Sequence, residues 1–329
     1  MDIFYPQLEL LSKAGLNCRF LRSNVRKTSL KKSHTRGTFL LNHCIVKHTN
    51  VREVSMANQV NPLSQAESWS RVAEGYAEMA DWVMSPFAKK AIEISNITPA
   101  SRVLDVACGT GILTCMLSNQ VKEIHALDFS HDMLNELKKR LLKRELFNVE
   151  TLQADGQNLP FDDNQFDHAF SLFGLMFFPD RIKGFKELHR VLKPGSAAIV
   201  SSWAPLEKST LMQATGAAIN SALPDAPSPR SNSRSLENPE LFKAEMEEAG
   251  FENVLIQECA MNLPAISPKM FWKLMSEGGA PIALLQSKYG PDEWHMISTK
   301  IMNYLHDTYT ESPMQLMTTA YFGIGIKKS

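Results

Sequence analysis

Several sequence features that would indicate particular classes of protein are scarce in this chain. Its 329 residues include only five cysteines, Cys18, Cys44, Cys108, Cys115 and Cys259, with no C-x-x-C spacing. This argues against a disulfide framework or a zinc site and predicts reduced thiols in the cytoplasm and no metal. No apolar run approaches the ~20 residues of a membrane-spanning helix. Because the formal net charge is zero, nothing attracts the whole chain to nucleic acid.

Acidic residues are missing from most of the first 60 positions. Ten Lys and Arg residues and no Asp or Glu lie between Leu10 and Arg52. Residues 1–60 therefore read as a basic, disordered leader. Three interpretations remain open, namely a mitochondrial or plastid transit peptide, a disordered extension, and an upstream start before Met56. Asp2 and Glu9 are atypical of a transit peptide, so a mitochondrial location is the alternative. A basic nucleic-acid tail ranks last because aromatic residues for stacking are sparse.

The remaining chain has what a folded enzyme needs, since 44% of all residues are hydrophobic. Val103, Leu104 and Val106 form a short apolar run that predicts a buried strand, and Gly109 and Gly111 end it in a tight turn. Helical spacing follows from Ile112. A third glycine of the dinucleotide fingerprint would fall on Thr114, so the pyrophosphate motif is incomplete.

Asp105 makes the same turn suitable for a different ligand. A carboxylate at the strand end repels phosphates but suits an ammonium group, while a helix N-terminus suits a carboxylate. The turn therefore suits an amino-acid zwitterion, such as the methionine half of S-adenosylmethionine. The sequence Leu104 to Gly111, LDVACGTG, resembles motif I of class I S-adenosylmethionine-dependent methyltransferases of the ubiquinone/menaquinone-biosynthesis type (methyltransferase type 11). The resemblance covers roughly residues 65 to 260.

Two further acids follow predicted strands. Asp128 lies 17 residues beyond Gly111, at the end of a strand predicted over 121–127, where a carboxylate can accept both ribose hydroxyls. Ser130 should cap the next helix, with Met133 against the adenine face. Asp155 precedes a Leu-Pro-Phe sequence and resembles the family's acid that accepts from the adenine amino group, with Gly156 and Gln157 beside the ring.

The apolar loop after a fourth strand, predicted over 166–172, should border the transferred methyl group. Phe173, Phe177 and Phe178 could hold the sulfonium with their ring faces. No cluster of catalytic acids and bases occurs there, and none of the histidines is assigned as a base. The candidate cofactor-binding residues are Tyr76, Asp105, Ala107, Cys108, Gly109, Thr110, Gly111, Asp128, Phe129, Met133, Asp155, Gly156, Gln157, Ser171 and Phe173.

The carboxyl-terminal part departs from the family's order. About 50 residues between the last two predicted strands are helical and rich in Met and aromatic residues. We interpret them as a cap that selects an apolar or aromatic acceptor and excludes water, and the alternative is a helical hairpin packed on the core or used in a homodimer. The predicted domains are the leader 1–60, a methyltransferase domain 61–266, the cap 267–312 and a final strand 313–329.

The sequence thus predicts an α/β fold, a doubly wound and mostly parallel seven-stranded sheet of the Rossmann-like methyltransferase type with a helical cap insertion. The predicted function is methyl transfer from S-adenosylmethionine to a small organic acceptor. A nicotinamide-dependent oxidoreductase and a cofactor-binding module without catalysis are the alternatives. The acceptor, the methylated atom and the oligomeric state are left open.

Overall fold

The computed structural model describes residues 61–226, 236–310 and 313–329. The predicted leader, residues 1–60, therefore lies outside the described residues, which begin at residue 61. The described residues belong to one compact unit, in which the helical segment 268–308 and the last strand pack together with the rest.

Seven strands form one sheet in the described part of the chain, in the order β3-β2-β1-β4-β5-β7-β6. Strand β7 is antiparallel to both of its neighbours, and the other pairings are parallel. This confirms the predicted fold class. The strands are β1 Arg102–Val106, β2 Glu123–Asp128, β3 Val149–Gln153, β4 Phe166–Leu172, β5 Leu192–Trp203, β6 Glu252–Asn262 and β7 Met317–Ile326.

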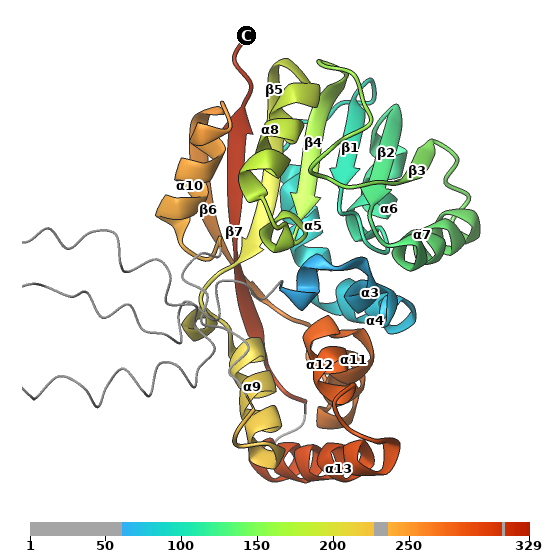
Figure 1. Cartoon of the computed structure of the whole chain (residues 1–329), viewed down its shortest axis with the longest axis vertical. Coiled ribbons are helices and arrows are strands. Elements are labelled where there is room, and N and C mark those ends of the chain that lie inside the picture. Colours follow the sequence, from blue (N-terminus) through green and yellow to red (C-terminus); the bar gives the residue numbers. More distant parts are fainter. Residues whose placement is uncertain (1–60, 227–235, 311–312) are drawn as a thin grey trace, which may run out of the picture. The chain divides into compact units, whose positions relative to one another are not determined.

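Helices cover both faces of the sheet (Figure 1). Phe185 of α8 and Phe242 of α10 are fully buried in the core on one face. Phe87 of α5 and Leu137 of α7 belong to the core on the other face. The helices around the sheet are α5 Ser85–Glu93, α6 Ile112–Leu117, η3 Ser118–Gln120, α7 His131–Lys143, η4 Leu175–Phe177, α8 Arg181–Val191, η5 Leu206–Lys208, α9 Thr210–Ala222 and α10 Pro239–Glu248.

A second group of helices lies at the end of the sheet where β1, β2 and β4 finish. In Figure 1 the blue helices α3 and α4 lie between this end of the sheet and the orange helices α11 and α12. Helix α13 packs against α9. This group comprises η2 Pro62–Ser64, α3 Ala66–Ser70, α4 Ala73–Val83, α11 Pro268–Gly278, α12 Ala280–Gln286 and α13 Pro291–Thr308.

Local signals account for many helix starts. Ser130 accepts a hydrogen bond from the Met133 amide nitrogen at 3.3 Å, as the capping prediction required. Ser267 caps α11 in the same way, and proline occupies the first turn there. The helical spacing of residues 64–97, broken at Ser85-Pro86, predicts two helices, and α5 does start at Ser85. Within the described residues three α-helices precede β1, because this stretch also contains the short α3.

Two strand boundaries differ from the prediction. The sequence predicts a turn over 190–195 before a strand over 197–203. In the structure Lys193, Pro194 and Gly195 lie inside β5, because Leu192 already pairs with Phe166 and pairing resumes at Ala197. Lys193 binds the Asp167 carboxylate there at 2.6 Å, far from the site described below. The last strand, which the sequence predicts over 314–326, begins as β7 only at Met317, because Met314 forms an isolated bridge with Ile266.

Candidate functional site

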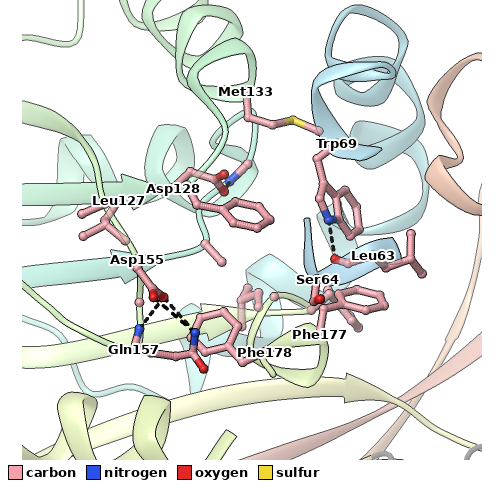
Figure 2. Close-up of a pocket in the computed structure, with 18 of the residues that line it drawn as sticks. Leu63, Ser64, Trp69, Leu127, Asp128, Met133, Asp155, Gln157, Phe177 and Phe178 are labelled. Carbon is pink, nitrogen blue, oxygen red and sulfur yellow. Dashed lines mark hydrogen bonds between the residues drawn. The ribbon is translucent and has the colours of Figure 1, made fainter. Parts of the chain in front are cut away.

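A pocket of about 330 Å³ lies at the carboxyl ends of β1 to β4, which is where ligands bind in doubly wound sheets. Its walls come from two sources, the loops that follow these strands and the helical segment 61–83. The lining residues are Leu63, Ser64, Trp69, Tyr76, Ala107, Gly109, Leu127, Asp128, Phe129, Met133, Ala154, Asp155, Gly156, Gln157, Leu172, Phe173, Gly174, Phe177, Phe178 and Pro179 (Figure 2).

Asp128 is the most constrained acid of the pocket. Its two carboxylate oxygens accept hydrogen bonds from the amide nitrogens of Gly109 and Ser130, each at 2.9 Å. Burial raises the pKa of Asp128 to about 6, although both of these hydrogen bonds lower it. Since a carboxylate has about four acceptor positions, it keeps room for hydroxyl donors of a ligand. This arrangement fits the predicted ribose contact.

Asp155 lies on the next strand tip, after β3. It accepts hydrogen bonds from the backbone and the side-chain amide of Gln157, at 2.9 and 3.1 Å. The side-chain oxygen of Gln157, Oε1, in turn accepts a hydrogen bond from the Asp180 amide nitrogen at 2.9 Å, which fixes this loop against α8. A Cβ at Gly156 would lie 2.5 Å from the Phe178 ring, so the ring lies directly against the backbone of this loop. Figure 2 shows the side chains of Asp155, Gln157 and Phe178 together on one wall.

Backbone conformation also marks the site. Ala107 and Phe173 have φ angles of 56° and 59°, a left-handed conformation that is unfavourable for residues other than glycine. They follow β1 and β4, which are adjacent in the sheet. A Cβ at Gly174 would lie only 2.3 Å from the Ala107 Cβ, so the two loops are in contact. Strained backbone of this kind clusters at ligand sites, and both residues line the pocket.

The opposite wall is aromatic. Trp69 donates a hydrogen bond to the Leu63 carbonyl at 2.8 Å and contacts Phe177, with ring centroids 5.1 Å apart. Tyr76 lies edge-on to Trp69, and its hydroxyl donates to the Met84 sulfur. Burial raises the pKa of Tyr76 well above its usual value, so the phenol stays neutral. These side chains offer ring faces and no ionised group.

The predicted site residues divide into two groups. Ten of them line the pocket, namely Tyr76, Ala107, Gly109, Asp128, Phe129, Met133, Asp155, Gly156, Gln157 and Phe173. The other five, Asp105, Cys108, Thr110, Gly111 and Ser171, lie behind it and are not among the lining residues. Ser171 is fully buried and accepts from the Leu175 amide nitrogen at 3.2 Å.

Asp105 differs most from its expected role. It is only 2% exposed and accepts a hydrogen bond from the Thr114 hydroxyl at 2.6 Å. Burial raises the pKa of Asp105 to about 7, the Thr114 hydrogen bond lowers it, and the charge of Asp128 raises it further. The carboxylate therefore supports the glycine loop from below through Thr114, and its contact with a ligand ammonium group stays a prediction.

Other residues of the pocket were not in the predicted set. Leu63 and Ser64 come from η2, whose start Asn61-Pro62 is a typical N-cap followed by proline. Trp69 lines the pocket as well, and so do Phe177 and Phe178, which the sequence suggested only as ring faces for the sulfonium. None of the lining residues is a histidine, and none comes from 267–310. The predicted cap thus does not touch the pocket in the part of the chain that the structure describes.

Comparison with known proteins identifies the family. The model of the ubiE/COQ5 methyltransferase family matches residues 59–267. The chain therefore belongs to the ubiE/COQ5 methyltransferase family. This excludes the oxidoreductase alternative, and S-adenosylmethionine is the usual cofactor of the ubiE/COQ5 family. The residues fit it, since a buried carboxylate, a second acid and aromatic faces line one pocket.

Individual relatives match a shorter stretch. Demethylmenaquinone methyltransferase from Staphylococcus epidermidis is 40% identical over 114 residues, which cover 34% of this chain and 46% of the relative. The Bacillus mycoides protein of the same name is 39% identical over 114 residues, 34% of this chain and 48% of the relative. The matches thus span about half of these relatives. The crystal structure of the YcgJ protein from Bacillus subtilis aligns over 74% of this chain and 98% of its own, with a TM-score of 0.49 and 19% identity.

Proposed function

We propose that the protein transfers a methyl group from S-adenosylmethionine to the ring of an apolar quinol, of the kind that demethylmenaquinone gives on reduction. The observation that carries this is the division of one pocket into a polar wall with Asp128 and Asp155 and an aromatic wall with Trp69 and Phe177. The polar wall suits an adenosyl group and the aromatic wall suits a flat, apolar ring. The names of the relatives support the choice of acceptor.

Each wall has a distinct task in this reaction. Asp128 holds the ribose hydroxyls, and Asp155 with Gln157 holds the adenine edge. Bound S-adenosylmethionine supplies a methyl group that is already activated as a sulfonium, so the protein needs only to orient the reactants and exclude water. Phe173 and Phe177 border the place where the two ligands meet and favour a cation over bulk water.

The step balances without a further reagent. The electron-rich ring carbon of the quinol attacks the methyl carbon, the carbon–sulfur bond breaks, and S-adenosylhomocysteine leaves. The ring then loses one proton. Tyr76 is not the base for this proton, because the raised pKa of its hydroxyl keeps it a neutral phenol. No histidine belongs to the lining residues among those described, so we propose that the proton leaves to water at the pocket mouth.

The direct test uses the purified protein, methyl-labelled S-adenosylmethionine, and a short-chain demethylmenaquinone kept reduced by dithionite. We expect label in the ring product, and no label when the quinone is left oxidised, because only the quinol ring is nucleophilic. Transfer to a hydroxyl oxygen instead of a carbon, identified by mass spectrometry of the product, would contradict the proposed acceptor atom. If the protein bound S-adenosylhomocysteine but transferred no methyl group, it would be a cofactor-binding module without catalysis.

Assembly and location belong to the same proposal. No helix within the described residues is long and apolar enough to cross a membrane. We keep the predicted cytoplasmic location and the homodimer as proposals, tested by cell fractionation and by light scattering. The mitochondrial alternative depends on residues 1–60, which lie outside the described residues.

A further inference from the structure

The aromatic wall of the pocket is backed by helices from the far end of the chain. Helices α3 and α4 present Trp69 and Tyr76 to the pocket on one side. On their other side they contact α12 and α11, respectively. Figure 1 shows this order, with the blue helices between the sheet and the orange ones. The wall is therefore a layer between the ligand site and the segment 268–286.

The contact between α4 and α11 is unusually close because glycine lies on both sides of it. A Cβ at Gly75 would lie 2.6 Å from the Glu277 carbonyl oxygen. A Cβ at Gly278 would lie 2.6 Å from the Met79 Cβ and 3.0 Å from the Gly75 carbonyl oxygen. Real Cβ atoms essentially never approach other atoms within 3.0 Å, so neither position has room for a side chain.

Space, and not backbone conformation, explains these two glycines. Neither is among the glycines with positive φ, so alanine could adopt both backbone conformations. Glycine within a helix is less favourable than alanine. The close approach of two backbones is what offsets that cost. Tyr76 is the residue next to Gly75, so any change in the crossing is passed directly to the pocket wall.

Further contacts fix the same layer. The Lys273 ammonium group bridges Glu78 of α4 and Glu277 of α11, at 2.8 and 3.0 Å. Trp82 donates to the Pro264 carbonyl at 2.9 Å. Ala280 of α12 is 1% exposed and is buried in one cluster with Val72, Ala73 and Met133.

The partly exposed members of that cluster include pocket residues. Leu63, Trp69 and Tyr76 pack against it, and each of them also lines the pocket. Met133, near the start of α7, is a buried member of the cluster and also lines the pocket. The segment 268–286 is therefore separated from the ligand site by one layer of helices, α3 and α4 (Figure 1). This relation differs from the direct cap that the sequence predicted.

We propose that Gly75, Gly278 and Ala280 are positioning residues, which set the depth of the acceptor side of the pocket by fixing how closely α3 and α4 are held against α11 and α12. The proposal rests on the proposed function for the identity of the acceptor. The position of the aromatic wall is argued from the helix contacts alone. The segment 268–286 then determines which acceptor fits without touching it.

The experiment replaces glycine by alanine at matched helical positions. Gly278→Ala opens the crossing, whereas Gly216→Ala, in α9, adds a methyl group where no atom lies within 4 Å. The protein is labelled with 5-fluorotryptophan, and the Trp69 resonance is assigned with Trp69→Phe. We expect the Trp69 resonance to shift in Gly278→Ala and to stay in place in Gly216→Ala. An unmoved Trp69 resonance in Gly278→Ala would overturn the proposal.

Kinetics separate positioning from general damage. Because a misplacement of about 1 Å can cost up to ~100-fold in rate, we expect the acceptor KM to rise ~5- to 10-fold in Gly278→Ala. The affinity for S-adenosylhomocysteine, measured by calorimetry, should change less than twofold, since Asp128 and Asp155 belong to the other wall. If the acceptor KM rose and the affinity for S-adenosylhomocysteine fell by the same factor, together with a lower melting temperature, the role would be merely structural. That outcome would overturn the proposal.

A double-variant cycle adds a second criterion. Gly75→Ala and Gly278→Ala open the same crossing, so the effect of the double variant on the Trp69 shift and on KM should be smaller than the sum of the single effects. Additive effects would contradict a shared crossing. If Gly278→Ala does not fold, Ala280→Gly removes one buried methyl group from the same layer and is judged by the same readouts.

The test also distinguishes this inference from the proposed function. If the wild-type protein methylates no quinol, the proposed function fails, while the fluorine spectra of the protein alone still decide whether segment 268–286 sets the position of Trp69.

Discussion

The two walls of the pocket are built in different ways. On the polar side, backbone N–H groups and carboxylates hold one another, as when Gly109 and Ser130 donate to Asp128. These contacts join residues close in sequence or on adjacent strand tips. On the aromatic side, helices pack through side chains and glycines, and the polar contacts behind them join residues 182 and 195 positions apart.

The difference has a functional consequence. A wall made from backbone hydrogen bonds has little freedom, which suits a donor with a fixed shape. A wall made from packed helices changes with any substitution in the layers behind it, which suits selection among acceptors. Variants on the two sides should therefore separate donor binding from acceptor binding, and the predictions below test this from the largest expected effect to the smallest.

Asp128→Ala should have the largest effect, and it should fall on the donor. It removes the two acceptor oxygens for ribose and leaves the Gly109 and Ser130 N–H groups without their partner. We expect S-adenosylhomocysteine binding to weaken by ~1.5–3 kcal/mol, measured by isothermal titration calorimetry. Asp132→Ala, on the exposed first turn of α7, is the control. Unchanged donor binding would remove Asp128 from the site.

Trp69→Ala should act on the acceptor. It removes the ring that contacts Tyr76 and Phe177. Since an aromatic pair contributes ~0.5–1.5 kcal/mol beyond its buried area, we expect the acceptor KM to rise roughly tenfold, with donor affinity nearly unchanged. Trp69→Phe should recover most of the affinity. If Trp69→Ala weakened the donor as much as Asp128→Ala does, the two walls would not be functionally separate.

Asp105→Asn should change stability rather than binding. The folded-state pKa of about 7 lies above the ordinary 3.8, so this carboxyl contributes stability below pH 3.8 that is lost as the pH rises through 7. An amide carries no charge and still accepts from Thr114. We expect Asp105→Asn to be more stable than the wild type by at least ~1 kcal/mol at pH 8, and by less at pH 5, in urea unfolding.

The same variant tests the original prediction for Asp105. A loss of donor affinity comparable to that of Asp128→Ala would restore the direct contact with the ammonium group. Nearly unchanged affinity is expected if Asp105 only supports the glycine loop through Thr114.

The pH dependence of donor binding should be the smallest effect. Burial raises the pKa of Asp128 to about 6, so protonation below that value removes the charge that we propose holds the ribose hydroxyls. We expect S-adenosylhomocysteine to bind about fourfold more weakly at pH 5.5 than at pH 8, by calorimetry. Asp128→Asn should show a flat profile over this range. The same slope in that variant would assign the titration to another group.

Much of the polar wall could be predicted from short sequence stretches. Gly109, Asp128 and Asp155 each follow a predicted strand, and parallel strands bring their carboxyl ends to one edge of a sheet. The order of the strands then places these residues together without any knowledge of side-chain packing. Asp105 shows the limit of this reasoning, because a residue at a strand end can point either into the pocket or under its loop.

The helical insertion shows the other limit. Its Met- and aromatic-rich composition predicted a surface for an acceptor, whereas Phe271, Trp272 and Leu274 are buried in the core. Apolar periodicity reveals that a helix face will be covered, and it does not say by what. Gly75 and Gly278 carried no signal in the sequence, because the reason for each glycine is the backbone of the other helix.

The sequence by itself thus determined the sheet, the strand tips and the acids that line the pocket beside them, since these depend on periodicity and on loops of a few residues. Only the tertiary structure decided which helices form the aromatic wall and what holds that wall. Those features depend on contacts between helices far apart in the chain, where the fit of two surfaces matters and the local sequence does not record it.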